Sequence, residues 1–598
     1  MVLRQTRELM QLRFFCLFFL PVNLFLTHYM IRNILSAALS FSIIAGCGSA
    51  GSTHDLEADS GFNITADSGM VVSAHPESSL IGVGILKAGG NAIDAAVATE
   101  FALAVCYPEA GNIGGGGFMV IRLADGRTDM IDYREKAPMR ADPDMFLDDS
   151  GNVVEGLSTA TCLASGVPGT VDGMVSIHSK YGVLSFKDVI QPAINLARNG
   201  FPVTEGQAQD LNLNRETFIM RNKTVPVFVK DTPWIKGDTL RQPDLALTLE
   251  RIRDLGRDGF YSGITARLIT GEMKRGNGIM TIEDLEGYTS EFRDPLTGEY
   301  RGYKIITAAP PSGGGVILLQ VLGMIEPEDL GALGFHTWQS VHLIAEAERR
   351  AFADRSKYLG DPGFSNIPVD ELLSDEYLAG RMKDFMTDSA SSSAVIGPGS
   401  PIPDGGVQTT HYSVVDHMGN AVSATTTLNN TFGSSIVVDS AGFLLNNEMD
   451  DFSVKPGVPN MFGLTGGSAN SAEPGKRMLS SMTPVIVESA GKLFLTAGSP
   501  GGSTIPTSVL QVLINVIDYG MSITQAVDSG RFHHQWLPDQ ISYEVNCFPA
   551  SSLEGLGRAG HKLSERKSIG RVNAIMIMPD GKMAGGPDRR GNNSAFGY

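Results

Sequence analysis

The stretch Gln408-Thr409-Thr410-His411-Tyr412-Ser413-Val414-Val415-Asp416 decides how this chain is interpreted. It follows a Ser-, Pro- and Gly-rich segment, residues 389–404, whose composition is typical of an exposed linker. Beyond it, the pattern of apolar residues predicts strands over 411–415 and 421–428, joined by a turn at 416–420. Thr409 therefore stands at the junction between a linker and a new structured segment.

A threonine at such a junction can become a nucleophile if the chain is cut just before it. A threonine hydroxyl is weak alone and needs a base. When threonine begins a chain, its own α-amine, with a reference pKa of about 7.7–8.0, can supply that base. Most single threonines are structural, so the assignment depends on the residues that accompany Thr409.

Length, composition and charge describe a large folded protein. Of its 598 residues, 42% are apolar and 19% are charged, which allows an extensive core and argues against global disorder. The formal net charge of -18 argues against nucleic acid or an anionic membrane surface as a partner.

The first 47 residues are typical of a targeting leader. A short basic stretch, residues 30–33, precedes an apolar run, 34–45, that ends in Ala45-Gly46-Cys47. Cysteine after two small residues resembles a bacterial lipoprotein box, which predicts that Cys47 is the lipidated first residue of the mature chain. An ordinary signal peptide and a membrane anchor remain alternatives, and Met30 would be a natural start.

The remaining chain alternates strand and helix patterns, which favours a layered α/β sandwich. A strand is predicted over 70–74, and a helix over 92–105 with Asn91 as its cap and a buried stripe formed by Ile93, Val97, Phe101 and Val105. Further helices are predicted over 77–88, 186–197, 243–255, 317–326, 337–357, 504–519 and 523–529. Further strands are predicted over 492–496, 572–578 and 582–584.

Two glycine clusters have different predicted roles. Gly501-Gly502 follows a strand, and successive glycine amides can point into one cavity and stabilise an oxyanion, although a plain strand-to-helix turn needs the same residues. The run 114–117 invites interpretation as a nucleotide loop. A strand-like segment, 118–123, follows it and no Gly-Lys-Ser/Thr motif is present, so we reject that interpretation.

Cysteine and histidine spacing indicates no metal site. After removal of the leader three cysteines remain, without Cys-x-x-Cys spacing, and one disulfide among them is possible. His533-His534 are adjacent and have no carboxylate at ligand spacing nearby. We expect no metal and no cofactor.

Several ordered motifs make the stretch around Thr409 resemble the processing site of bacterial γ-glutamyltransferases, which are N-terminal-nucleophile hydrolases. The resemblance runs from about Met70 to Tyr598. It includes Gly89-Gly90-Asn91-Ala92-Ile93-Asp94-Ala95-Ala96, Gly166-Val167-Pro168-Gly169-Thr170, Pro310-Pro311-Ser312-Gly313-Gly314, Leu445-Asn446-Asn447-Glu448-Met449-Asp450-Asp451-Phe452 and Gly498-Ser499-Pro500-Gly501-Gly502.

The resemblance implies a fold and a maturation step. The fold would be α/β, a four-layer αββα sandwich. Thr409 would attack the Gln408 carbonyl and cut the chain into a large subunit, residues 48–408, and a small catalytic subunit, residues 409–598. The two would remain together as a heterodimer in one intertwined domain, preceded by the leader of residues 1–47.

The resemblance also implies roles for individual residues. Thr409 would be the nucleophile, Thr427 its hydrogen-bonding partner, and Gly501 and Gly502 the oxyanion donors. Arg134 would bind the substrate α-carboxylate, and Glu448 and Asp451 would hold its α-ammonium, as suits an amino acid headgroup. Further contacts to that headgroup would come from Asn429, Ser480 and Ser481. Without the resemblance, Arg134 reads as a surface ion-pair residue and the serines as turn residues.

One position departs from the family pattern. Residues 456–467 resemble a lid loop that usually carries a tyrosine hydrogen-bonded to the asparagine at the position of Asn429. Here the residue is Phe462, so that bond cannot form. We predict a looser lid and easier access for bulky acceptors.

The resemblance therefore predicts hydrolysis of γ-glutamyl amides such as glutathione and transfer of the glutamyl group to amino acids, peptides or water. A glutaryl or cephalosporin-type acylase and a non-catalytic γ-glutamyl-peptide-binding lipoprotein are the alternatives. Because a glutaryl group lacks the ammonium, Asp451 favours glutamyl. We expect a periplasmic protein, anchored to the outer membrane through Cys47.

Overall fold

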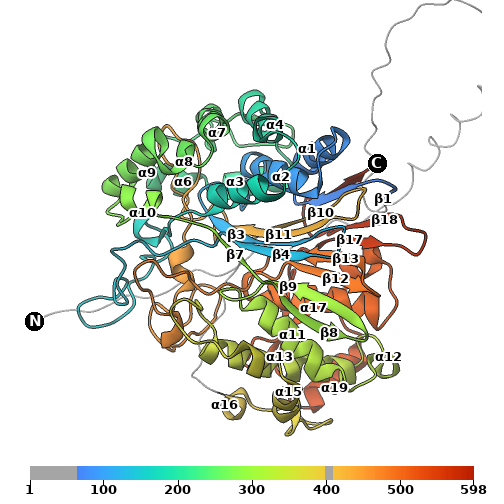
Figure 1. Cartoon of the computed structure of the whole chain (residues 1–598). Coiled ribbons are helices and arrows are strands. Elements are labelled where there is room, and N and C mark those ends of the chain that lie inside the picture. The colour runs from blue at the N-terminus through green and yellow to red at the C-terminus, as the bar shows by residue number, and fades with distance from the viewer. Residues whose placement is uncertain (1–63, 398–408) are drawn as a thin grey trace, which may run out of the picture. The chain divides into compact units, whose positions relative to one another are not determined.

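Two facing antiparallel sheets of seven strands each form the centre of the computed structural model, which describes residues 64–397 and 409–598 (Figure 1). The first sheet has the order β19(Ser594–Gly597), β2(Met70–Ser73), β10(Thr410–Val415), β11(Ala421–Thr427), β3(Gly116–Arg122), β4(Thr128–Asp132), β7(Glu291–Arg293). The second has the order β1(Thr65–Ala66), β18(Met583–Pro587), β17(Asn573–Ile577), β13(Lys492–Gly498), β12(Val485–Ser489), β9(Tyr303–Thr307), β8(Leu296–Tyr300).

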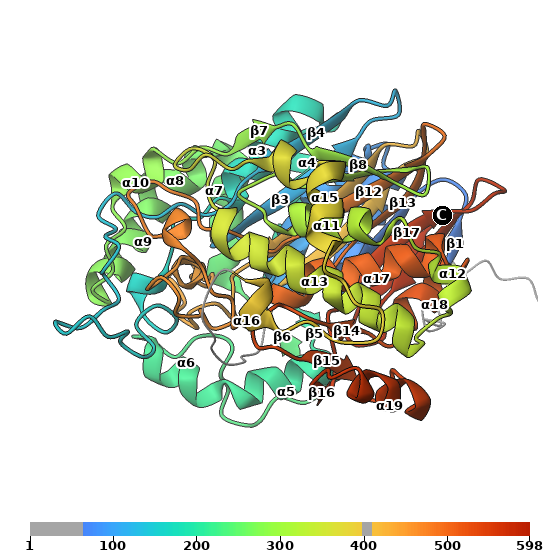
Figure 2. The same ribbon diagram turned by 90° about the horizontal axis from the view of Figure 1, so that it is seen from below.

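Helices cover the outer face of each sheet, which completes the four layers (Figure 1). The first sheet is covered by α1(Pro76–Lys87), α2(Ala92–Cys106), α3(Thr170–Tyr181), α4(Phe186–Asn199) and α7(Pro243–Leu255). The second is covered by α11(Gly314–Ile325), α13(Trp338–Tyr358), α17(Ile505–Ile517) and α18(Ile523–Asp528), and Figure 2 shows α11, α13 and α17 from that side. The predicted αββα sandwich is confirmed.

Alternation along the strands divides the core into three apolar layers. In β3, Met119 and Ile121 pack against the helices, whereas Phe118 and Val120 face the other sheet. Successive strand residues point to opposite faces, so a strand buried on both sides places every side chain in the core. This accounts for the apolar run 118–121 in β3, whereas the buried strands β10 and β11 keep polar residues such as His411 and Thr425, which are hydrogen-bonded to each other.

Both sheets combine strands from either side of the Gln408–Thr409 bond. In the first sheet, β10 and β11 lie between β2 and β3, and β19 pairs with the other edge of β2. In the second, β9 pairs with β12. The two predicted subunits would therefore share both sheets.

Helix α2 differs from its prediction in how much of it is buried. Asn91 caps it as predicted: its side chain accepts hydrogen bonds from the Ile93 and Asp94 amides, and Asp94 completes a capping box. We predicted a single buried stripe, but all fifteen residues from Ala92 to Cys106 are buried. Its non-stripe positions are mostly alanine, which allows close packing on every side.

The start of the predicted linker is anchored to the protein body. Residues 389–397 include the short helix α16(Ser393–Ile396). Ser393 is buried, its amide donates to Asp539 and its carbonyl accepts from the Trp536 indole. The exposed-linker prediction is therefore wrong at Ser393, and residues 398–404 lie outside the described residues.

The three described cysteines, Cys106, Cys162 and Cys547, are buried free thiols, so none of the disulfides that the sequence allowed is formed among them.

Within residues 64–397 and 409–598, no helix has both the length and the apolar character needed to cross a membrane.

Candidate active site

The hairpin of β10 and β11 places Thr409 and Thr427 side by side. The register pairs Thr410 with Thr426, so Thr409, one residue before β10, stands opposite Thr427, the last residue of β11. Side chains at directly opposite positions of antiparallel strands are neighbours. Both threonines are almost fully buried and line one cavity.

Hydrogen bonds fix the end of β11. The Asn429 amide donates to Thr427 Oγ1 at 2.7 Å, and Asn112 Nδ2 donates to the Thr427 carbonyl at 2.8 Å. Asn429 has a φ of 77°, a left-handed conformation that asparagine tolerates better than most residues. Its side-chain amide donates to the Asn447 carbonyl at 3.0 Å, which links β11 to the acidic segment that follows.

A buried ion-pair cluster occupies the opposite wall of the cavity. The Arg134 guanidinium lies 2.7 Å from Glu448 and 2.5 Å from Asp451, and its side chain is 1% exposed. Burial by itself would lower the pKa of Arg134, but these two carboxylates and Glu135 raise it above its usual range. Burial raises the pKa values of Glu448 and Asp451, and Arg134 opposes that rise. This wall of the cavity therefore carries one fixed positive charge, Arg134, beside the carboxylates of Glu448 and Asp451.

Gly501 and Gly502 form the turn between β13 and α17. Their φ values are 145° and 52°, which favour glycine strongly. Thr504 closes the turn by donating from its amide and its hydroxyl to the Gly501 carbonyl. Gly502 lines the same cavity as Thr409 and begins the helical segment, where backbone amides can stabilise negative charge.

Ser480 and Ser481 lie on an irregular segment held against the Pro310-Pro311-Ser312-Gly313 turn. The Ser480 amide donates to the Pro311 carbonyl, and the Gly313 amide donates to the Ser480 carbonyl. Both serines line the cavity. The motif 310–314 and the segment that carries Ser480 and Ser481 are far apart in the sequence and meet beside this cavity.

Arg355 is a residue near the cavity that the sequence analysis did not assign. It lies near the end of α13, is buried, and donates to Ser481 Oγ at 3.4 Å. Burial lowers its pKa to about 10, while Asp451 attracts its charge, so it stays cationic at neutral pH. The signal that could have identified Arg355 was a basic residue near the end of a long helix, and that helix is buried on most of its faces.

Phe462 covers the cavity. Phe462 is 4% exposed, its amide donates to Asn460 Oδ1 at 3.0 Å, and its carbonyl accepts from Gln535 Nε2 at 3.3 Å. The cavity measures about 20 Å³, enough for about one water molecule. A substrate group larger than that requires this loop or the ion-pair cluster to move. Whether the loop is looser than in relatives stays a prediction.

One cavity therefore brings together most of the residues assigned from sequence: Arg134, Thr409, Thr427, Asn429, Glu448, Asp451, Phe462, Ser480, Ser481 and Gly502. Gly501 is adjacent to it in the chain. Gln408 and Cys47 lie outside the described residues.

The glycine run 114–117 has a packing role. A Cβ on Gly115 would lie 2.0 Å from the Thr427 carbonyl oxygen, and one on Gly117 would lie 2.3 Å from the Thr425 carbonyl oxygen. Side chains here would push β3 away from β11, so glycine is required by close backbone approach. This explains the cluster without a nucleotide loop.

His533 and His534 are hydrogen-bonded core residues. Thr507 and Gln535 contact the two nitrogens of the His533 ring, and the Trp536 amide donates to His534. Elsewhere in the described residues, His342, Glu346 and His561 have potential ligand atoms within 4.8 Å of one another. Arg349 and Arg350 both pair with Glu346, which disfavours a cation there.

Comparisons with known proteins agree with this geometry. The family model described as Gamma-glutamyltranspeptidase matches residues 78–598. The glutathione hydrolase proenzyme of Escherichia coli (strain K12) is 45% identical over 568 residues, covering 95% of this chain and 98% of that protein. The crystal structure of Helicobacter pylori gamma-glutamyltranspeptidase is 48% identical, covers 55% of this chain and 94% of that chain, and has a TM-score of 0.54. The crystal structure of cephalosporin acylase from Bacillus halodurans is 26% identical, covers 94% of this chain and 99% of that chain, and has a TM-score of 0.77. The chain therefore belongs to the gamma-glutamyltranspeptidase family of enzymes.

Proposed function

We propose that the protein hydrolyses γ-glutamyl amides such as glutathione and transfers the glutamyl group to amino acids or peptides. The observation that carries this is the position of Thr409 in one cavity with a buried Arg134 and Asp451. A γ-glutamyl group bears a carboxylate and an ammonium on one carbon, and these two residues offer the complementary charges.

The reaction uses Thr409 twice. In the precursor, Thr409 Oγ attacks the Gln408 carbonyl carbon, a C–O bond forms, and the C–N bond to Thr409 breaks. The resulting ester is hydrolysed by water, which leaves a free α-amine on Thr409. In the mature enzyme that amine accepts the hydroxyl proton as Oγ attacks the γ-carbonyl of the substrate.

The second cycle ends by acyl transfer. As the acyl–Thr409 ester forms, the substrate C–N bond breaks and the departing amine takes the proton. Water or an acceptor amine then attacks the ester carbon, releases the glutamyl group and returns the proton to Thr409 Oγ. The amides of Gly501 and Gly502 would stabilise the oxyanion in both steps.

Intact-mass measurement of the purified protein under denaturing conditions tests this proposal. We expect two fragments, the smaller beginning at Thr409, and release of glutamate from glutathione. The variant Thr409→Ala should remain a single chain without activity. A wild-type chain that stays uncut would contradict the proposal.

The acylase alternative is weaker on one specific contact. The similar cephalosporin acylase shows that this architecture supports other amide substrates. A glutaryl group has no ammonium, however, and would leave the half-buried carboxylate of Asp451 without the partner that a glutamyl group supplies. Comparing rates on glutathione and a glutaryl amide separates the two activities.

We also propose that Cys47 is lipidated and that the mature protein is held at the periplasmic side of the outer membrane. The leader pattern before Cys47 supports this. Metabolic labelling with a fatty-acid analogue should mark the wild type and not Cys47→Ser. Equal labelling of both proteins would exclude lipidation at Cys47.

A further inference from the structure

A second, larger cavity lies on the other side of the oxyanion turn. It measures about 580 Å³ and is lined by Pro500, Gly501 and Thr504, whereas Gly502 and Ile505 line the catalytic cavity. The two cavities therefore share the turn that precedes α17. The larger one falls in the size range of pockets that bind small organic molecules.

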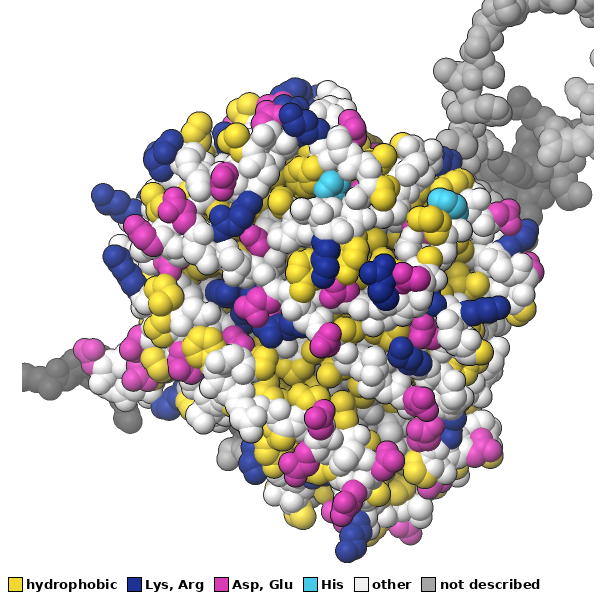
Figure 3. All heavy atoms as spheres, in the orientation of Figure 1, with side chains coloured by type: hydrophobic (Ala, Val, Ile, Leu, Met, Phe, Trp, Pro, Cys, Tyr) yellow, Lys and Arg dark blue, Asp and Glu magenta, His cyan; other side chains and the backbone are white. Residues whose placement is uncertain are grey.

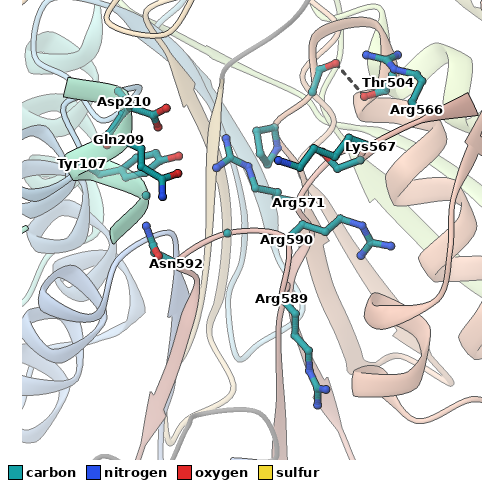
Figure 4. Close-up of a pocket in the computed structure, with 17 residues that line it drawn as sticks. Tyr107, Gln209, Asp210, Thr504, Arg566, Lys567, Arg571, Arg589, Arg590 and Asn592 are labelled. Carbon is teal, nitrogen blue, oxygen red and sulfur yellow. Dashed lines mark hydrogen bonds between the residues drawn. The ribbon is translucent and has the colours of Figure 1, made fainter. Parts of the chain in front are cut away.

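One wall of this cavity is basic. It is built from the end of β16(Leu563–Arg566) and the segment that follows, and contributes Arg566, Lys567 and Arg571 (Figure 4). Lys567 and Arg571 point across the cavity, and Lys567 forms no ion pair with any described residue. The Arg571 main-chain amide donates to Ser499 Oγ, which ties this wall to the oxyanion turn.

The opposite wall is polar, and it includes the carboxylate of Asp210, which attracts Arg571. It comes from the end of α2 and from α5(Glu205–Leu213), with Tyr107, Gln209 and Asp210 facing the basic wall (Figure 4). Glu109 also lines the cavity, but burial raises its pKa to about 8, so it is mostly neutral at pH 7. The cavity thus concentrates positive charge within a chain of net charge -18, whose face in Figure 3 mixes acidic and basic side chains.

Position and charge identify the ligand class. Any γ-glutamyl peptide carries, beyond the amide that is cut, a short chain that ends in a carboxylate, and so does an acceptor peptide. A lysine and an arginine next to the oxyanion turn are suited to a carboxylate. We propose that this basic cavity binds the terminal carboxylate of the leaving or the acceptor peptide, an inference that rests on the proposed function.

Matched substrates isolate the carboxylate. For the leaving peptide, we would compare hydrolysis of glutathione with hydrolysis of its C-terminal amide. For the acceptor, we would compare glycylglycine with glycylglycinamide, using γ-glutamyl-4-nitroanilide as a donor whose leaving group has no carboxylate. The two pairs distinguish a leaving-peptide subsite from an acceptor subsite.

The test variant is Lys567→Gln, because Lys567 is exposed and its loss should not disturb folding. We expect its kcat/KM to fall about threefold to fivefold for the carboxylate member of at least one pair, with no change for the amide member or for 4-nitroanilide hydrolysis. Lys567→Glu should enlarge the same difference, since it reverses the charge. The control is Lys562→Gln, which removes an exposed lysine that lies just before β16 and does not line the cavity.

Three results would overturn the inference: equal losses for carboxylate and amide substrates, no loss for either, or a wild-type enzyme that does not distinguish the members of either pair. In each case turnover of γ-glutamyl-4-nitroanilide would leave the proposed function standing. Absence of turnover of every γ-glutamyl donor by the wild type would instead refute the proposed function itself.

Discussion

Asp451 is the single side chain that we propose selects the acyl group. Its carboxylate lies 2.5 Å from Arg134 and also accepts a hydrogen bond from Asn460 Nδ2 at 3.0 Å. It is therefore held in place before substrate arrives. A fixed charge loses little conformational freedom on binding, so its effect should fall on substrate affinity.

We predict that Asp451→Asn raises KM for glutathione about tenfold or more, because a hydrogen bond to a charged group contributes about 1.5–3 kcal/mol. The ratio of glutaryl-amide to glutathione hydrolysis should rise, since a glutaryl group has no ammonium. Steady-state kinetics on both substrates measure this. Unchanged KM values for glutathione would show that Asp451 does not contact the ammonium.

Phe462 lines the same cavity, and we predict that it controls access to it. In the variant Phe462→Tyr, a hydroxyl is added near Asn429, whose side-chain amide now donates to the Asn447 carbonyl. We predict that this variant discriminates more strongly against bulky acceptors. The measurement is the ratio of transfer rates to a bulky amino acid and to glycylglycine, and an unchanged ratio would contradict the looser-lid prediction.

For helices and strands, the sequence predicted where each element begins and ends better than it predicted what surrounds that element. The pattern placed α7 at its observed bounds and α2 to within one residue, because caps and apolar spacing are local signals. It could not reveal that α2 is surrounded, since that depends on α1, α4 and the first sheet closing around it. The walls of the basic cavity were equally hidden, because they come from residues near 107, 209, 500 and 570.

The cap of α2 gives a prediction on stability. Asn91→Ala removes the acceptor for two helix amides and the donor to the Tyr181 carbonyl. We expect the free energy of unfolding to fall by about 1–2 kcal/mol. Urea denaturation measures this, with Asn195→Ala in the exposed face of α4 as the matched control. Equal losses in the two variants would exclude a capping effect.

For the whole molecule, the sequence predicted the layers and most of the catalytic cavity, because several ordered motifs together resemble one family. It missed Arg355, whose relevance comes only from the packing of α13 against the segment carrying Ser481. It also missed how little space the cavity has. Both depend on elements that meet only in the folded chain.

Buried histidines make stability depend on pH. Burial lowers the pKa values of His75, His336 and His534 to about 4 and of His411, His533 and His561 to about 3. These groups bind protons near pH 6.5 when unfolded and not when folded, so their contribution is complete above pH 6.5 and is lost as pH falls toward 3–4. Burial of Glu100 and Glu109 raises their pKa values to about 7 and about 8 and opposes the trend, because their contribution is lost as pH rises.

Because each of the six histidines takes up a proton on unfolding below pH 6.5, we predict that the histidine contribution to stability declines below pH 6. Each net proton taken up on unfolding contributes a slope of about 1.4 kcal/mol per pH unit. Urea denaturation at pH 7, 6 and 5 measures the slope, and His417→Asn, at an exposed site, should leave it unchanged. Equal stability at pH 7 and pH 5 would contradict the prediction.

The strand order around β10 bears on the order in which synthesis, folding and cleavage of the chain occur. β2, made early, pairs with β10 on one side and with β19 on the other, and both of these strands are made late. We therefore expect synthesis and folding of the whole chain to precede the proposed cut at Gln408. If the chain were cut earlier, the two fragments would have to associate as separate molecules before the shared sheets could form. The intact Gln408–Thr409 bond would keep the two halves of the chain together while both sheets form, and the proposed cleavage would follow that assembly.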